Sequence, residues 1–237
     1  MRPARPGWPV ARARWFLRRM RAAGRHECTV LGRSFAVERD VFSPQYSRST
    51  EFFAAALLPH CHGKTPLEIG SGCGAVSVLA ALAGARSVTA VDVNPNAVEC
   101  TRANIRRHHV ADTVTVRSSP AMLRTWQAFD VVFFALPYVF VDDVEPFRRE
   151  FGDLTCSCFD ERYTTQRAFF KMAARVDDGS LAVYAGFGVP GDLSRFHRNL
   201  AVAGLDSYLV AAAREGRGDN RLYRLSRRDV KPRRAKL

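Results

Sequence analysis

The sequence lacks an apolar run of about eighteen residues, the length that a membrane-spanning helix needs. Its first 25 residues also lack the apolar core of a secretory signal, although their arginines leave a mitochondrial-type presequence as the less favoured alternative. We therefore expect no membrane partner and a cytoplasmic location. Lysine is scarce as well, with 4 Lys against 32 Arg, and in an alanine-rich chain this ratio indicates a coding bias. High arginine content alone is therefore weak evidence of function.

Paired cysteine knuckles are also absent. The six cysteines include no C-x-x-C pair, which a structural zinc site would show, and Cys156-Ser157-Cys158 has the wrong spacing for one. His60-Cys61-His62 resembles a ligand cluster but lies where a helix is expected to end. We expect free thiols in a reducing compartment and no metal site.

Acidic residues are missing where the chain is most basic. Residues 1–25 carry eight Arg and no acid (+8), and residues 214–237 carry ten basic and three acidic residues (+7). Because the net charge is +13, the body between them, 26–213, carries −2. Two basic ends on a near-neutral body leave RNA possible as a partner.

Strand and helix patterns alternate through most of the chain. A hairpin is expected in 26–42 and a helix at 51–58, before the alternation begins. Buried strands are then expected at 66–69, 87–93, 113–117, 129–136 and 180–187, and an antiparallel pair at 206–214 and 221–226. The sequence therefore predicts an α/β fold, a doubly wound (Rossmann-like) seven-stranded sheet, mostly parallel with a C-terminal antiparallel strand pair. The stretch 137–163 is expected to be an irregular loop.

Three glycines, Gly70, Gly72 and Gly74, follow the first of these strands and precede a helix. Such a turn can be tight and can approach a ligand closely, because glycine has no Cβ. Asp92 ends the next strand, where its carboxylate can accept hydrogen bonds from ribose hydroxyls. Glu68 would repel a pyrophosphate but suits a cationic ligand, which disfavours a nicotinamide oxidoreductase.

The segments Glu68–Gly74 and Val91–Ala97 resemble motifs I and II of class I S-adenosylmethionine-dependent methyltransferases. The resemblance implies S-adenosyl-L-methionine as cofactor, a turn that wraps its methionine part, and an enzyme of the methyl-transferring class. It also implies that Ser118 can replace the acid that often meets the adenine amine. The cofactor-binding residues expected in this way are Glu68, Gly70, Ser71, Gly72, Gly74, Asp92, Val93 and Ser118.

The loop after the fourth strand, Ala135-Leu136-Pro137-Tyr138, resembles the catalytic Asn/Asp-Pro-Pro-Tyr/Phe loop of the "small-domain" branch. That branch includes release-factor glutamine methyltransferases and ribosomal-RNA guanine-N2 and adenine-N6 methyltransferases. Carbonyl groups of such a loop hold the N–H groups of a weakly nucleophilic nitrogen while the ring stacks on its plane. Ala135 replaces the side-chain acceptor and Leu136 the first proline, so Tyr138, Pro137 and backbone carbonyls remain.

The expected organisation is a basic N-terminal extension (1–25), a hairpin and helix (26–59), a methyltransferase domain (60–228) and a basic tail (229–237). Acidic residues in 139–163 suggest a lid over a cationic acceptor, or simply a solvated face. We expect N-methylation of a small metabolite or a protein side chain, with an RNA base methyltransferase or an inactive cofactor-binding module as alternatives. The oligomeric state is left open.

Overall fold

The computed structural model describes residues 7–118, 126–176, 180–189, 191–216 and 218–229 of the 237-residue chain, and the structural statements below concern these residues. Among them, no helix is long and apolar enough to span a membrane.

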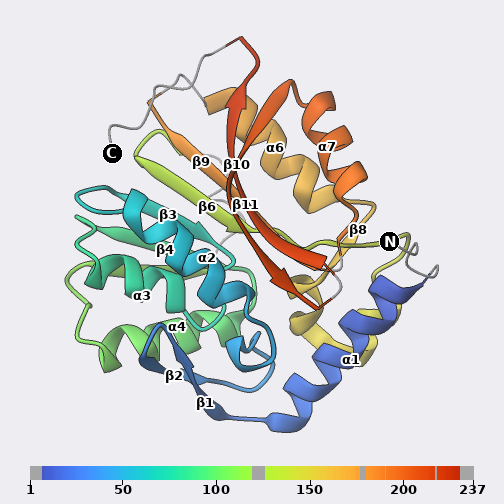
Figure 1. Cartoon of the computed structure of the whole chain (residues 1–237). Coiled ribbons are helices and arrows are strands. Elements are labelled where there is room, and N and C mark those ends of the chain that lie inside the picture. The colour runs from blue at the N-terminus through green and yellow to red at the C-terminus, as the bar shows by residue number, and fades with distance from the viewer. Residues whose placement is uncertain (1–6, 119–125, 177–179, 190, 217, 230–237) are drawn as a thin grey trace.

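A seven-stranded sheet in the order β10-β11-β9-β6-β3-β4-β5 forms the centre of the molecule (Figure 1). Five of its strands are parallel neighbours: β3 (Pro66–Ile69), β4 (Val88–Asp92), β5 (Val114–Ser118), β6 (Val131–Ala135) and β9 (Ala182–Phe187). Strand β11 (Gly218–Arg227) lies antiparallel to both β9 and β10 (Leu205–Glu215). This arrangement confirms the predicted fold class, including the C-terminal antiparallel pair.

Helices cover both faces of the sheet, and the sequence of β6 shows why. Its alternate residues Val131 and Phe133 join one core cluster, whereas Val132 and Phe134 join the other. A strand that is buried on both faces reads as a continuous apolar run. The first cluster is completed by α2 (Ser49–Leu57), α3 (Ala75–Leu82) and α4 (Pro95–Arg107), and the second by α6 (Thr164–Val176) and α7 (Leu193–Val202).

Local signals fix where the helices begin. The Asn94 side chain accepts a hydrogen bond from the backbone N–H of Asn96 at 2.9 Å, and Pro95 occupies the first position of α4. Asp192 caps α7 in the same way through the N–H of Arg195 at 3.0 Å. Polar caps satisfy amide groups that have no partner within the helix, and proline costs nothing at its first position.

The predicted hairpin is confirmed as β1 (His26–Val30) paired with β2 (Arg33–Val37). Its two turn residues, Leu31 and Gly32, have φ values of 47° and 75°, the left-handed pair that matches the twist of a two-residue hairpin. Asn104 of α4 exchanges two hydrogen bonds with the backbone of Ala36, at 2.8 and 2.9 Å. The hairpin is therefore attached to the helical layer over the sheet.

The prediction of an irregular loop at 137–163 is wrong. This segment, here called the insertion, contains β7 (Val139–Val141), α5 (Glu145–Phe151), the 3-10 helix η4 (Gly152–Ser157) and β8 (Phe159–Glu161). Strands β7 and β8 pair in parallel as a separate two-stranded sheet. Elements of three to seven residues carry too little periodicity to be recognised in a sequence.

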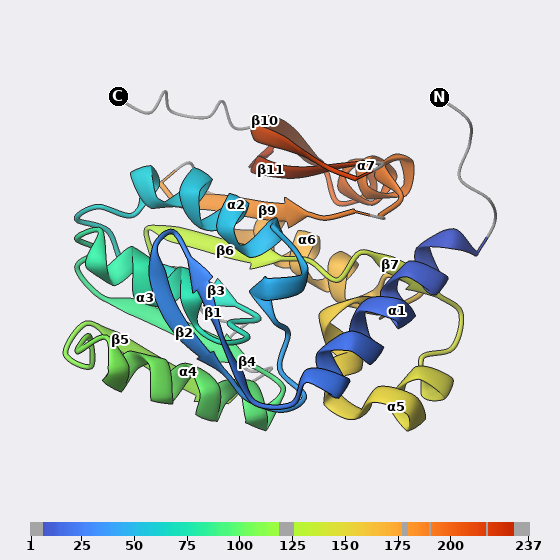
Figure 2. The same cartoon turned by 60° about the horizontal axis from the view of Figure 1, so that its bottom comes forward.

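Much of the basic N-terminal segment forms a helix, α1 (Trp8–Ala23), which packs on the insertion (Figure 2). Its buried residues Ala13, Phe16, Leu17 and Met20 share a core cluster with residues of β7, α5, η4 and β8. Burial of each large apolar side chain contributes about 1.5–3 kcal/mol. Helix α1 therefore stabilises the insertion as well as carrying charge.

Candidate active site

A pocket of about 500 Å³ lies at the carboxyl ends of β3, β4 and β6. In open parallel sheets this edge is the usual place for a ligand, because the loops that leave the strands diverge there. The segment between β2 and α2, α2 itself, α6 and the insertion supply its other walls. The pocket therefore joins the predicted cofactor loop to the predicted acceptor loop.

The turn after β3 is held against β4. The backbone N–H groups of Gly70 and Ser71 both donate to the carbonyl of Val91, at 2.8 and 3.1 Å. Gly70 has a φ of 73°, and a Cβ there would come within 3.1 Å of the Phe134 ring. Glycine is therefore required at this position for both conformation and space.

The other two glycines of the turn differ in their surroundings. Gly72, with a φ of 56°, lines the pocket, and a Cβ added there would meet nothing within 4 Å. Gly74, with a φ of 79°, precedes α3, and a Cβ there would come within 2.7 Å of the Thr101 side chain. Gly72 thus leaves room in the pocket, whereas Gly74 allows close packing of α3 on α4 and does not line the pocket.

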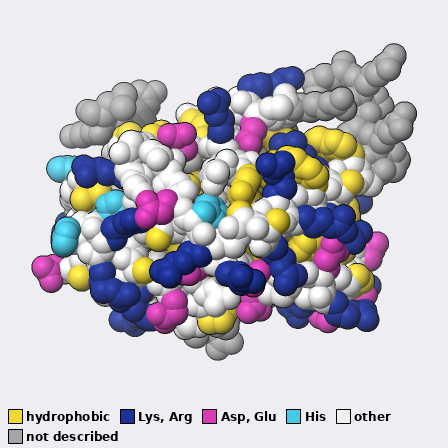
Figure 3. Space-filling model, turned by 90° about the horizontal axis from the view of Figure 1, so that it is seen from below, with side chains coloured by type: hydrophobic (Ala, Val, Ile, Leu, Met, Phe, Trp, Pro, Cys, Tyr) yellow, Lys and Arg dark blue, Asp and Glu magenta, His cyan; other side chains and the backbone are white. Residues whose placement is uncertain are grey.

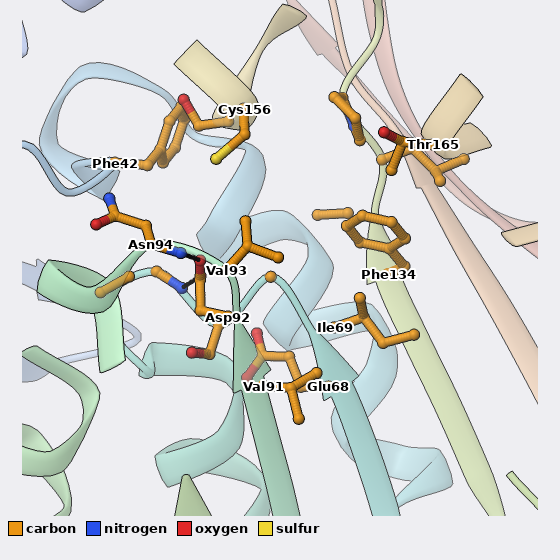
Figure 4. Close-up of a pocket in the computed structure, with 18 of the residues that line it drawn as sticks. Phe42, Glu68, Ile69, Val91, Asp92, Val93, Asn94, Phe134, Cys156 and Thr165 are labelled. Carbon is orange, nitrogen blue, oxygen red and sulfur yellow. Dashed lines mark hydrogen bonds between the residues drawn. The ribbon is translucent and has the colours of Figure 1, made fainter. Parts of the chain in front are cut away.

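Asp92 links the turn to the end of β4, as the dashed lines in Figure 4 show. One carboxylate oxygen accepts the N–H of Gly72 and the other accepts the N–H of Asn94, both at 2.9 Å. Burial raises the pKa of Asp92, although these hydrogen bonds, with one from Val93, lower it. Each carboxylate oxygen can accept a further hydrogen bond, such as one from a ribose hydroxyl.

Glu68 lies below Asp92 in the same wall of the pocket (Figure 4). Its carboxylate accepts hydrogen bonds from the backbone N–H of Ser77, at 2.9 Å, and from the Ser77 hydroxyl. Burial raises its pKa to about 8 despite these bonds, and the nearby Asp92 adds to the rise. The sequence suggested a carboxylate facing a cation. In the structure, burial favours the protonated form of Glu68, and a nearby cation would favour the ionised form.

The acceptor loop begins where β6 ends. The N–H of Leu136 donates to the carbonyl of Gly186 at 3.0 Å, and the Leu136 side chain belongs to the core cluster with α6 and α7. Ala135, exposed and lining the pocket, adds only a methyl group. Leu136 therefore anchors the loop, and Ala135 offers no side-chain hydrogen-bond acceptor to the pocket.

Tyr138 is half-buried, and its ring packs on Gly188, where an added Cβ would come within 2.8 Å of the ring. Burial raises the pKa of Tyr138, and a hydrogen bond to Cys158 adds to the rise. The backbone carbonyl of Tyr138 accepts a hydrogen bond from Tyr163 at 3.3 Å. Tyr138 is thus a fixed neutral phenol in the pocket wall, suited to packing rather than to proton transfer.

Most of the predicted site residues lie together in this one pocket. Among the predicted cofactor residues, Glu68, Gly70, Ser71, Gly72, Asp92 and Val93 line it, as do the predicted loop residues Ala135, Leu136, Pro137 and Tyr138. Ser118 is exposed at the end of β5 and is outside the lining, as is Gly74. The roles of these residues stay predictions, but their convergence is a property of the fold.

Sequence reasoning missed the walls supplied by distant segments. They come from the segment between β2 and α2, from α2, from the insertion and from α6, and include Phe42, Pro44, Phe53, Asp153, Cys156, Phe159, Thr165 and Phe169. Figure 4 shows Phe42 and Cys156 on one side of the pocket and Phe134 and Thr165 on the other. Only the tertiary fold brings these segments together, so the sequence did not assign these residues to the pocket.

The insertion does not form an acidic lid. Asp160 is buried and accepts N–H groups at the start of α6, at 2.9 and 3.0 Å, and Glu150 pairs with Arg14 and Arg18 of α1. Among the acids of the insertion, Asp153 lines the pocket. These carboxylates therefore stabilise helix ends and the α1 interface, and the cationic acceptor inferred from them loses its support. Within the described residues, no cluster of three potential metal ligands occurs.

Comparison with known proteins adds a sequence match over the site. Residues 57–136 match the family model of ribosomal protein L11 methyltransferase, PrmA. The ribosomal protein L11 methyltransferase of Anoxybacillus flavithermus is 37% identical over 70 residues, which are 30% of this chain and 22% of that protein. A candidate protein N5-glutamine methyltransferase of Methanocaldococcus jannaschii is 34% identical over 76 residues, 32% of this chain and 38% of that one. The chain thus matches well under half the length of either relative.

Solved structures share the fold over most of the chain. Wild-type Trm5b from Pyrococcus abyssi has a TM-score of 0.58 at 16% identity, covering 85% of this chain and 56% of that one. A candidate methyltransferase complexed with SAH has a TM-score of 0.56 at 14% identity, covering 84% and 56%. The chain therefore has the fold of class I methyltransferases and, over 57–136, a sequence that matches a methyltransferase family model, and both likenesses support S-adenosyl-L-methionine as its cofactor.

Proposed function

We propose that the chain catalyses methyl transfer from S-adenosyl-L-methionine to a nitrogen atom. The observation that carries this proposal is the single pocket, which places the turn of Gly72, the carboxylates of Asp92 and Glu68 and the loop of Tyr138 around one cavity. The cofactor would supply an electrophilic methyl group on a positively charged sulfur. The chain's residues would bind that donor at the β3–β4 edge and hold the acceptor at the end of β6.

Asp92 and Glu68 would bind different parts of the donor. Asp92 would accept hydrogen bonds from the ribose, because its oxygens are already positioned by the N–H groups of Gly72 and Asn94. Glu68 would stabilise the positive charge of the donor, since a nearby cation favours its ionised form. Gly72 would let the chain approach the ligand without a side chain between them.

The acceptor side favours an uncharged nitrogen that is planar or part of a flat group. The walls there are largely aromatic or aliphatic: Phe42, Phe53, Leu136, Pro137, Tyr138 and Phe159. The phenol of Tyr138 is held neutral, so the loop itself offers no strong base. Catalysis would then depend on orientation. Backbone carbonyls would accept the N–H groups while the lone pair faces the methyl group, and the extra proton would leave to water after transfer.

The relatives support a macromolecular acceptor. Those that match over the site are named for methylating ribosomal protein L11 or a protein glutamine. A protein side-chain amide and the exocyclic amine of a nucleic-acid base share the same chemistry, a flat group with a delocalised nitrogen lone pair. A small metabolite with such a group would fit the same walls.

The proposal is tested by incubating the full chain with methyl-labelled S-adenosylmethionine and fractionated lysate, and by calorimetric titration with S-adenosylhomocysteine. We expect label in one acceptor fraction and saturable binding of the product. Binding without label in RNA, protein or metabolites would instead support an inactive cofactor-binding module, and the Ala135→Asn variant would show whether the missing amide is the cause. Binding of a dinucleotide but not of S-adenosylhomocysteine would contradict the proposal.

A further inference from the structure

An exposed tryptophan on α1 is stacked with an arginine and a tyrosine. Trp15 is 52% exposed, whereas its neighbour Phe16 is 8% exposed and packs in the core. The guanidinium of Arg19 lies 5.0 Å from the centre of the Trp15 ring and 5.6 Å from that of Tyr46. We call this row of three flat groups the Trp15–Arg19–Tyr46 track. Trp15 therefore stays about half exposed, with its ring beside an exposed arginine.

The track ends two residues along the chain from a residue of the pocket wall. Tyr46 closes the 3-10 helix η1 (Pro44–Tyr46), and Pro44 itself lines the pocket. Figure 2 shows α1 beside the segment that joins β2 to α2, and Arg21 of α1 pairs with Asp40 in that segment at 3.4 Å. The track therefore has a fixed position relative to the pocket opening.

The surroundings of the track are positively charged. Some arginines are matched by acids: Arg14 and Arg18 by Glu150, and Arg25 by Glu38. The guanidinium groups of Arg19, Arg39 and Arg48 have no carboxylate of the described residues within 4.0 Å, whereas the backbone N–H of Arg48 donates to the Glu215 carboxylate at 3.3 Å. Figure 3 shows Lys and Arg side chains spread over the face of the molecule that is seen from below, with fewer Asp and Glu side chains between them. The field around the track favours a polyanion.

We propose that the Trp15–Arg19–Tyr46 track binds a single-stranded nucleic acid and leads one of its bases into the pocket. Indole, guanidinium and phenol planes stack on bases of any sequence, and arginines neutralise the phosphates between them. An acidic protein segment would pair with the arginines but would have no bases to stack on the flat side chains of the track. A duplex would keep its bases away from the pocket, because a base must leave the stack to be modified. The inference rests on the proposed function and names the acceptor as a base amine.

Deletion of residues 1–25 would not test this, because α1 is part of the core with the insertion. Point variants of exposed residues are cleaner: Trp15→Ala and Arg19→Glu in the track, Trp15→Phe as the conservative variant, and Arg198→Glu as the matched control. Arg198 is exposed on α7, away from the track in the chain and in the fold. The assay is fluorescence anisotropy of labelled twelve-nucleotide RNA and DNA strands of the same mixed sequence, at several salt concentrations.

We expect the unaltered chain to bind a strand in a salt-dependent way. Trp15→Ala and Arg19→Glu should each weaken binding about tenfold or more, and Trp15→Phe and Arg198→Glu about threefold or less. Arg19→Glu should also reduce the salt slope. A preference for RNA or for DNA identifies the source of the strand. Calorimetry should show unchanged affinity for S-adenosylhomocysteine in every variant, so a failure here is distinguishable from a failure of the proposed function.

Several results would overturn the inference. One is no strand binding by a chain that binds S-adenosylhomocysteine. Another is an equal loss in Arg19→Glu and Arg198→Glu, which would indicate a general charge effect. A third is unchanged binding in Trp15→Ala, or equal competition by heparin, because neither fits stacking on bases. Label that enters protein alone, at a rate unaffected by Trp15→Ala, would point to a protein acceptor instead.

Discussion

Replacement of Glu68 by glutamine should stabilise the empty protein and weaken cofactor binding at the same time. Burial raises the pKa of Glu68 from 4.5 to about 8. Between these pH values the folded state keeps a proton that the unfolded state has lost, so this group makes wild-type stability fall as the pH rises from about 4.5 to about 8. At 1.36 kcal/mol per pKa unit, the folding free energy lost through Glu68 approaches about 5 kcal/mol at pH 8 and about 3 kcal/mol at pH 7.

Glutamine keeps the shape and an oxygen that can accept the bonds from Ser77, but it never carries the charge. Glu68→Gln should therefore unfold at higher urea concentration than the wild type at pH 8 and at a similar concentration at pH 5. Glu99→Gln, at an exposed position of α4, is the matched control. It should leave the urea midpoint unchanged at both pH 8 and pH 5. If the urea midpoint depends on pH in the same way in the wild type and in Glu68→Gln, the free-energy cost assigned to burying the Glu68 carboxylate is refuted.

Glu68→Gln should also weaken binding of the cationic donor. We expect the affinity of Glu68→Gln for S-adenosylmethionine to fall about 10- to 100-fold, the range for loss of one charge pair at about 5 Å in a partly screened site. In the wild type, binding should release a proton from Glu68, so affinity should rise between about pH 6 and pH 8. Calorimetry in two buffers of different ionisation enthalpy measures that proton. Equal affinity of both proteins, with no proton released, would contradict the account.

The remaining predictions concern three other positions. Asp92→Ala should weaken binding of S-adenosylhomocysteine about tenfold or more, because it removes the ribose acceptor and the bond to Gly72, and an unchanged Kd would contradict that role. Gly72→Val should abolish cofactor binding in calorimetry while circular dichroism still shows a folded chain with a lower Tm, since the added side chain enters open space but valine is strained at a φ of 56°. Tyr138→Ala should lower kcat about tenfold or more and leave the Kd for S-adenosylhomocysteine within about threefold, whereas equal losses would indicate a structural role.

The parallel sheet was predictable because its strands are short and apolar and are bounded by residues that interrupt strands, such as proline and glycine. Strand β3 was predicted at its observed limits, since proline begins it and Gly70 ends it. The C-terminal pair was predictable because the turn between its strands is too short for a crossover helix. The helix expected at 51–58 spans Ser49–Leu57, a shift of one or two residues at each end.

Helix α1 was hidden by its charge. Ala13, Phe16, Leu17 and Met20 follow the spacing of one helix face, but arginines between them led to an interpretation as a basic extension. The helical period was therefore a usable signal. What the helix packs on was not, because its partners in the insertion lie more than a hundred residues away in the chain.

The candidate site also contains residues that could be predicted from the sequence and residues that could not. Gly70, Gly72 and Asp92 were found because a strand, a turn and the next strand bring them together locally. Phe42 and Cys156 belong to segments that only tertiary packing places over the pocket. The protonated state of Glu68 was also beyond the sequence, since burial sets it.

Calorimetric titration of the purified full chain with S-adenosylhomocysteine tests the central claim most directly, with the wild type and Asp92→Ala measured side by side. The account predicts one site per chain in the wild type and a clear loss of affinity in the variant. No heat of binding in the wild type, or the same affinity in both proteins, would contradict it.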